Sequence, residues 1–271
     1  MNFPTMLQLE SSTACSARCI FCPHSELKRP QGSMSDELYI KILNDAARCG
    51  IKQVLLFLNG EPFIFSRIFQ WLDELRSRGM TTIFYTNASH LDSEKAARLV
   101  RYSDTVTNMI FSVSGIDQLT HHDIMGLDHE RVKNNITNFM SVNQGKIPCV
   151  AQMPLFSKTE SWVDQWQKLW EPIVGTAHTT CMYNYAGRIH DRLETRLPRK
   201  YCGRLDHLYV LWDGRVCLCC MDSEGEVILG NLNNQSVSEV FNSVMMNSFR
   251  DSHRRECWDN LSLCNVCNMN V

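Results

Sequence analysis

The chain has 271 residues, 44% of them apolar, and its 27 basic and 29 acidic residues give a formal net charge of -2. This length and apolar fraction suffice for one sizeable core with a small appended domain, and the near-neutral charge excludes a global field that would attract nucleic acid or an acidic membrane surface. The first residues are too few and too polar for a signal peptide and no apolar run approaches the roughly 18 residues of a membrane span, so we expect a cytoplasmic protein that binds neither membrane nor nucleic acid.

The first two-thirds of the chain alternates short apolar runs with longer amphipathic segments, which predicts strand-helix units around a parallel sheet. We predict strands over residues 6–10, 53–58, 82–86, 109–114 and 148–153, and helices over 36–49, 64–78, 93–102, 129–142 and 162–170. The predicted fold class is therefore α/β, a partial (β/α)6 TIM-like barrel, and the active site should lie at the carboxyl ends of its strands.

From about residue 198 the pattern changes to short strands and tight turns. Predicted strands over 207–212 and 215–219 flank Asp213-Gly214, which is typical of a hairpin, while Gly230-Asn231 predicts a further turn and 237–246 a helix. We therefore predict two domains, a barrel over residues 1–195 and a small α+β domain over 196–271. This second domain has too few apolar runs to form a good hydrophobic core. We therefore expect it to depend on a bound metal for its fold.

Thirteen cysteines is a high count for a chain in a reducing compartment, where disulfides are a poor explanation and metal or redox chemistry is a better one. The cysteines gather near the two ends of the chain. Cys49, Cys149 and Cys181 stand apart from these groups, and an isolated cysteine is usually a small buried apolar residue.

The N-terminal group is Cys15-x3-Cys19-x2-Cys22, directly after the first predicted strand. Three thiolates on one loop can hold three irons of a 4Fe-4S cube and leave the fourth iron open for a cofactor or substrate. A zinc site completed by His24 is the alternative. The spacing, the aromatic Phe21 before the last cysteine and the preceding strand favour the cluster.

This loop resembles the signature of the radical S-adenosylmethionine (SAM) superfamily, Cys-x3-Cys-x-aromatic-Cys. The resemblance implies that Cys15, Cys19 and Cys22 bind a 4Fe-4S cluster whose open iron chelates the amino and carboxylate groups of SAM, with Phe21 near the adenine. It further implies that electron transfer cleaves SAM to a 5'-deoxyadenosyl radical, which abstracts a hydrogen atom from the substrate.

Further positions resemble SAM-binding positions of that family. The stretch Asn59-Gly60-Glu61-Pro62 resembles its Gly-Gly-Glu-Pro motif, which binds the methionine amino group; Asn59 replaces the first glycine, a change we expect to be tolerated because main-chain groups make much of the contact. The resemblance also assigns strand-end residues to the SAM ribose or carboxylate, Asn87 and Ser112, and to the adenine, Gln152 and Met153. Ordinary strand ends and barrel lining are the alternatives for these four.

The C-terminal cysteines resemble the SPASM/twitch extension, which carries auxiliary 4Fe-4S clusters. The resemblance assigns four ligands to one auxiliary cluster, Cys202, Cys219, Cys264 and Cys267, with Cys219 in the family's Gly-x4-Cys spacing after Gly214. Cys220 is the alternative to Cys219, because neighbouring residues of a strand point to opposite faces and only one can reach the metal. A four-thiolate zinc ribbon is the alternative to the cluster.

The expected function is that of a radical SAM oxidoreductase, which dehydrogenates a small molecule in natural-product biosynthesis while the auxiliary cluster accepts the electron. The layout is similar to that of the twitch-bearing aminocyclitol dehydrogenases. The alternative is crosslinking or epimerisation of a ribosomally made peptide, and for epimerisation Cys149 or Cys181 would return a hydrogen atom. A non-catalytic zinc-binding protein is the third hypothesis. Expected partners are the small-molecule or peptide substrate and a flavodoxin- or ferredoxin-type electron donor.

Overall fold

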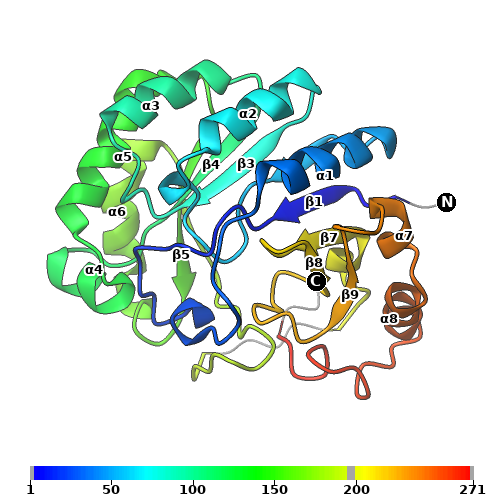
Figure 1. Ribbon diagram of the computed structural model, residues 1–271. Helices are drawn as coiled ribbons and strands as arrows, with labels where there is room; N and C mark the ends of the chain where they lie inside the picture. The colour runs from blue at the N-terminus through cyan, green and yellow to red at the C-terminus, as the bar shows by residue number, and fades with distance from the viewer. Residues whose placement is uncertain (1–2, 194–198, 269–271) are drawn as a thin grey trace.

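The structure, a computed structural model, describes residues 3–193 and 199–268. In this part of the chain six parallel strands lie side by side in chain order (Figure 1): β1 (Met6–Leu9), β2 (Gln53–Leu55), β3 (Thr82–Thr86), β4 (Val106–Ser112), β5 (Cys149–Leu155) and β6 (Ala177–Cys181). β1 pairs with β2, the strands β3 to β6 pair in sequence, and a bridge between Gln53 and Thr81 joins the two sets. The α/β prediction of a partial barrel is confirmed.

Helices cover the outer face of these strands (Figure 1). They are α1 (Asp36–Arg48), α2 (Ile68–Ser77), α3 (Ser93–Leu99), α4 (Gln118–Met125), α5 (His129–Asn143) and α6 (Val163–Val174), with single turns η1 (Pro23–Glu26), η2 (Pro62–Ile64), η3 (Val100–Tyr102) and η4 (Glu160–Trp162). Side-chain caps begin several of them; Ser35, Asp92 and Asp128 each accept a hydrogen bond from a backbone N–H in the first turn. Within the described ranges, none of these helices has the length and apolar character that crossing a membrane requires.

The C-terminal part continues the same sheet. Its elements are η5 (Gly203–Asp206), β7 (His207–Val210), β8 (Arg215–Cys217), β9 (Ile228–Asn231), α7 (Val237–Phe241) and α8 (Val244–Arg254). β7 pairs in parallel with β1 and antiparallel with β8, so the sheet order is β2-β1-β7-β8-β9. The predicted boundary between residues 195 and 196 lies outside the described residues, and the division into two domains stays a prediction.

Three expectations about individual elements are corrected, and two elements were not predicted. The predicted helix over 237–246 is two helices, because Ser243 caps a new helix by accepting a hydrogen bond from Met246 N–H. Gly230-Asn231, predicted as a turn, ends strand β9, and the second hairpin strand stops at Cys217. Helix α4 and strand β6 were not predicted: α4 is short with little segregation of apolar residues, and the sequence of β6, Ala-His-Thr-Thr-Cys, is mostly polar.

Behind β4, helix α4 buries the side chain of a histidine. His121 is fully buried, its Nδ1 hydrogen bonds to the Ser114 carbonyl, and the ring of His129 lies 5.3 Å away. Gly115 allows this packing, since a Cβ there would lie 2.5 Å from the His121 backbone nitrogen. Burial lowers the pKa of His121 to about 4.

The stability of the protein should therefore fall on mild acidification. In the unfolded chain this histidine is protonated near pH 6.5, whereas in the folded protein it is protonated only near pH 4. The contribution of neutral His121 to stability is therefore complete above pH 6.5 and is lost as the pH falls below that value. We expect urea unfolding to show about 1 kcal/mol less stability at pH 5.5 than at pH 7.5 from this residue, a difference that His121→Asn removes. The exposed His178→Asn serves as the control, and an unchanged pH slope in His121→Asn would contradict the assignment.

Candidate active site

A cavity of about 700 Å³ opens at the carboxyl ends of the barrel strands. The strands and the loops that follow them bring most of the predicted site residues to its wall: Cys15, Cys19, Phe21, Cys22, Asn59, Gly60, Glu61, Asn87, Ser112, Gln152, Cys181 and Cys220. This is the end of a parallel barrel where loops from several strands meet.

The three N-terminal cysteines lie on the loop between β1 and η1. Backbone bonds from Arg18 N–H to Met125 and from Ile20 N–H to Ile124, 2.8 and 3.0 Å long, attach this loop to the end of α4. Burial raises the pKa of the Cys15 thiol to about 12 and also raises the pKa values of Cys19 and Cys22. Thiolates at this depth need a compensating cation, so the donor set fits an iron-sulfur cluster.

His24 follows the triplet but uses one ring nitrogen elsewhere. Its Nε2 lies 2.6 Å from the Thr13 carbonyl oxygen, so this nitrogen donates a hydrogen bond and only Nδ1 is left for the zinc site considered above. Among the His, Cys, Asp and Glu residues that the structure describes, no group of three is arranged to hold a single metal ion.

The loop after β2 packs directly on the cysteine loop. A Cβ on Gly60 would lie 2.1 Å from the Ser12 carbonyl oxygen, and Glu61 N–H donates to the Ala14 carbonyl over 2.8 Å. The Glu61 carboxylate accepts hydrogen bonds from Thr86 Oγ1 (2.6 Å) and from the backbone N–H groups of Phe63 and Asn87. Burial raises the pKa of Glu61 to about 7, against these hydrogen bonds, which lower it. Its side chain thus joins β2 to β3.

Asn59 and Pro62 flank this pair. Pro62 is buried at the start of η2 and does not line the cavity. Asn59 lines it, but its side-chain Nδ2 donates over 3.0 Å to Glu10 Oε1. The side chain of Asn59, the residue that replaces the family's first glycine, is therefore bound to Glu10. Its main-chain groups remain for contacts with a ligand in the cavity.

Glu10 belongs to a buried ion pair beneath the site. It is fully buried, and both of its oxygens accept hydrogen bonds from the Arg29 guanidinium. Arg29 Nε also donates to the Ser223 carbonyl, and Trp212 N–H donates to Glu10. One carboxylate thus connects the end of β1, the cysteine loop, the loop after β2 and the C-terminal part of the chain.

Removing one partner of this ion pair should be strongly destabilising. Arg29→Met leaves the Glu10 charge buried without compensation, and we expect a loss of about 3 to 5 kcal/mol in unfolding free energy by urea titration. The double variant Glu10→Gln with Arg29→Met should recover part of the loss. A loss below about 1 kcal/mol in Arg29→Met, as for an exposed pair, would contradict this role.

The remaining predicted SAM positions divide between the two faces of the sheet. Ser112 and Gln152 line the cavity, where Gln152 Nε2 donates to Thr180 Oγ1, and Asn87 Nδ2 lies 3.9 Å from Cys15 Sγ. Met153 is fully buried in the apolar core and does not line the cavity, because successive strand residues alternate between faces. Its predicted approach to the adenine is corrected.

The two candidate hydrogen donors are also separated. Cys181 ends β6, is exposed and lines the cavity. Cys149 begins β5, at the opposite end of that strand from the cavity, and its thiol donates to the Ile147 carbonyl over 3.2 Å. The placement of Cys149 near the top of the barrel is therefore corrected.

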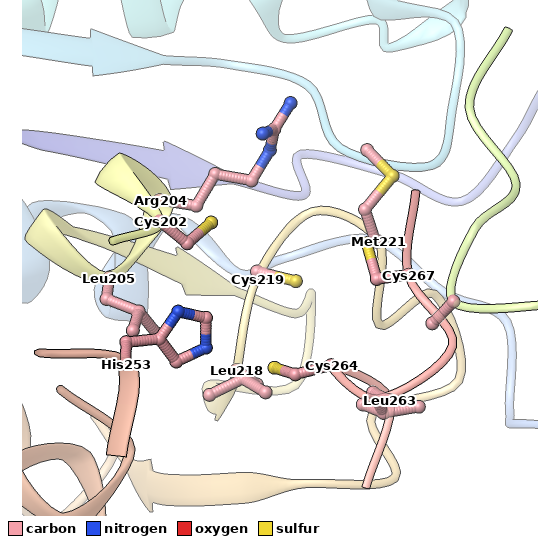
Figure 2. A pocket seen from close by; sticks show the side chains of 11 residues that line it. Cys202, Arg204, Leu205, Leu218, Cys219, Met221, His253, Leu263, Cys264 and Cys267 are labelled. Carbon is pink, nitrogen blue, oxygen red and sulfur yellow. The ribbon is translucent and has the colours of Figure 1, made fainter. Parts of the chain in front are cut away.

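The four cysteines assigned to the auxiliary site line one small cavity in the C-terminal part (Figure 2). Cys202 precedes η5, Cys219 follows β8, and Cys264 and Cys267 lie near the end of the described chain. The rest of the wall is largely apolar, with Leu205, Leu218, Met221 and Leu263, and also includes Arg204 and His253; among the described residues it holds no carboxylate. A set of four thiols in apolar surroundings fits the chemistry of a thiolate-bound cluster.

Cys219 and Cys220 face different cavities. Cys219 faces the small cavity with the other three cysteines, whereas Cys220 lines the large one, where Arg204 Nε donates to its sulfur over 3.2 Å. Both residues lie beyond the end of β8, so the separation comes from the loop and not from strand alternation. This placement favours Cys219 over Cys220 as the ligand.

The paired variants Cys219→Ala and Cys220→Ala should differ in iron content. After anaerobic reconstitution we expect Cys219→Ala to fall from about eight irons per chain to about four, because the auxiliary cluster loses a ligand. Cys220→Ala should keep about eight. Iron and sulfide analysis of both variants is the measurement. Loss of iron in Cys220→Ala alone would show that Cys220, and not Cys219, is the ligand.

The cavity also presents polar residues that were not singled out from the sequence as site residues. They are Gln8, Gln53, Tyr85, Arg204, His207 and Tyr209, on β1, β2, β3, η5 and β7. The alternation of His207 and Tyr209 with buried Leu208 and Val210 marks one polar face of β7, and this is a signal in the sequence. The pairing of β7 with β1 is what turns that face into the cavity.

Two family models match the chain. The radical SAM superfamily model matches residues 9–166, and the SPASM model, an iron-sulfur cluster-binding domain, matches residues 202–268. The first domain implies a 4Fe-4S cluster and SAM, and the second implies auxiliary iron-sulfur binding.

Two curated proteins match parts of the sequence. A tungsten-containing aldehyde ferredoxin oxidoreductase cofactor-modifying protein of Pyrococcus furiosus is 26% identical over 47% of this chain and 37% of its own length. An S-adenosylmethionine-dependent nucleotide dehydratase of Flammeovirga pacifica is 29% identical over 37% of this chain and 36% of its own length. The chain thus spans little more than a third of these relatives.

Solved structures with the same fold extend over nearly the whole chain. BtrN in complex with AdoMet and 2-DOIA has a TM-score of 0.74 at 18% identity and covers 99% of this chain and 94% of its own. Native anSMEcpe with bound AdoMet has a TM-score of 0.73 at 17% identity, over 96% and 89%. Streptococcus suis SuiB bound to its precursor peptide SuiA has a TM-score of 0.68 at 14% identity, over 99% and 70%.

These similarities at low identity establish a shared fold, while the family models establish descent. Since the radical SAM model matches more than half of the residues and coincides with the barrel that carries the cysteine triplet, this protein belongs to the radical SAM superfamily and is a radical SAM enzyme with a SPASM domain.

Proposed function

We propose that this protein is a radical SAM oxidoreductase that dehydrogenates a small polar molecule. The observation that carries the proposal is the contact between its two cavities. Arg204 and Met221 line both the large cavity with the N-terminal cysteines and the small cavity with the C-terminal cysteines. A substrate held in the large cavity is thus separated from the auxiliary cysteines by single side chains, a short path for an electron.

The chain offers a donor set for each cofactor. Cys15, Cys19 and Cys22 would hold the SAM-binding cluster, and Cys202, Cys219, Cys264 and Cys267 the auxiliary one. The main chain at Gly60 and the side chains of Asn87, Ser112 and Gln152 would hold SAM. When bound, these groups supply a 5'-deoxyadenosyl radical that takes a hydrogen atom from the substrate and an acceptor for the electron that the substrate then releases with a proton. A flavodoxin- or ferredoxin-type protein would supply the reducing electron.

His207 is the candidate acceptor for that proton. It lines the large cavity at the start of β7, and its Nδ1 lies 2.9 Å from Thr5 Oγ1, which leaves Nε2 for the substrate. Burial lowers the pKa of His207, so the ring is neutral at neutral pH and can accept a proton.

The cavity volume favours a small molecule over a peptide. About 700 Å³ lies within the range of roughly 300 to 1,000 Å³ typical of small-molecule sites, and SAM would occupy part of it. Peptide maturation remains the second candidate because Cys181, an exposed thiol on the cavity wall, is available to return a hydrogen atom. Solvent deuterium at carbon in an epimerised peptide would favour this candidate, whereas a small-molecule product that has lost two hydrogens favours dehydrogenation.

The decisive test is iron analysis with an assay of reductive SAM cleavage. Wild type should contain about eight irons per chain by Mössbauer spectroscopy after anaerobic reconstitution and should cleave SAM with dithionite. The triple variant Cys15→Ala, Cys19→Ala, Cys22→Ala should contain about four irons and cleave none, because only the auxiliary ligands remain.

Zinc at the second site of the wild type, with about four irons, would remove the proposed electron acceptor and contradict the dehydrogenation. Wild type that holds both clusters but cleaves no SAM would contradict the radical chemistry itself.

A further inference from the structure

Arg204 presents a positive charge to the large cavity. The residue lies in η5, and its side chain points away from Cys219 and Cys264 of the auxiliary cavity (Figure 2). Its Nε donates to Cys220 Sγ, and its guanidinium carbon lies 5.8 Å from the centre of the Tyr183 ring. Among the described residues it forms no ion pair, so the N–H groups of both terminal nitrogens are available to a ligand.

Among the described residues, the rest of the cavity wall supplies no free carboxylate to pair with Arg204. Glu61 is the carboxylate residue among those that line it, and both of its oxygens are occupied by Thr86 and by backbone N–H groups. Other polar groups on the wall are neutral at pH 7, among them the phenols of Tyr85, Tyr183 and Tyr209 and the amides of Gln8 and Gln53. Within the described residues these five side chains have no hydrogen-bond partner in the protein.

A half-buried guanidinium with free N–H donors is most strongly satisfied by an oxyanion, which can accept two parallel hydrogen bonds from its planar fork. Neutral phenols and amides around it suit hydroxyl or carbonyl groups of the same ligand.

We propose that the substrate is a small polar molecule that carries an oxyanion, a carboxylate or a phosphate, and that Arg204 binds this group. The inference rests on the proposed function for the presence of a small-molecule substrate. It places the anionic end of the substrate against η5, where Arg204 separates the two cavities, and the uncharged end toward the cysteine triplet and SAM. Arg204 is thus a residue that determines substrate specificity.

The experiment measures anion binding by calorimetry on the reconstituted enzyme with SAM, at constant ionic strength. Inorganic phosphate and acetate are the probes, and glycerol is the uncharged comparison. We expect at least one anion to bind wild type and to bind Arg204→Gln at least about 10-fold more weakly, because the charge-assisted hydrogen bonds are lost. Arg204→Lys should retain intermediate affinity. Preference for phosphate indicates a phosphorylated substrate, and preference for acetate a carboxylate.

Arg199→Gln is the matched control. Arg199 also stacks on an aromatic ring, that of Trp258, but does not line the large cavity, so this variant should bind the anions as wild type does. Equal anion affinity in wild type and Arg204→Gln, or the absence of anion binding by wild type, overturns the inference.

A second measurement needs no variant. Phenylglyoxal modification of Arg204, followed by peptide mass spectrometry, should be slowed by the anion that binds and not by chloride at the same ionic strength; equal rates overturn the inference. Reductive SAM cleavage is assayed on the same wild-type samples. Its absence refutes the proposed function, whereas intact cleavage with unchanged anion affinity in Arg204→Gln refutes the role of Arg204 alone.

Discussion

The arrangement of the site depends on the buried carboxylate of Glu10. Arg29, Asn59 and Trp212, from three other parts of the chain, donate hydrogen bonds to its two oxygens, and Arg29 also donates to the Ser223 carbonyl. An ion pair at this depth adds little net stability, since the desolvation of both charges offsets their attraction, but it tolerates few alternative arrangements. This carboxylate therefore fixes the orientation of the cysteine loop, the loop after β2 and the C-terminal part relative to one another. These segments contribute residues to the walls of the two cavities.

Much of the fold could be predicted from periodicity. The strands over residues 6–9 and 82–86 and helix α1 have patterns long or apolar enough to identify them, and caps such as Ser35 mark their limits. Strand β6 could not be found, because its mostly polar sequence gives no apolar pattern, and Thr180 and Cys181 line a cavity that exists only after folding. The break between α7 and α8 rests on one side-chain cap at Ser243, which competes with a continuous helical pattern. Such local competition is decided by tertiary packing.

The site was predictable wherever ligand spacing carries the information. The cysteine triplet and the Gly60-Glu61 pair are local patterns, and the loop placements of both follow from the parallel barrel. The spacing of residues in the sequence does not show where each side chain points. It could therefore not distinguish Cys219 from Cys220, or show that the Asn59 side chain binds Glu10. Arg204 and His207 belong to the wall only because β7 pairs with β1, a contact between residues about 200 positions apart. No local pattern contains it.

That same pairing constrains when the protein can mature during synthesis. β1 lies between β2 and β7, so one of its edges is unsatisfied until residues 207–210 have left the ribosome. At about 5 to 20 residues per second, the interval between the synthesis of the two strands is roughly 10 to 40 s. The cysteine loop leaves the ribosome at the beginning of this interval. The hydrogen bond from Trp212 N–H to Glu10, which completes the support of the loop, forms only at the end of the interval. Stable insertion of the N-terminal cluster is thus a late event of biosynthesis, although its ligands are among the first residues made.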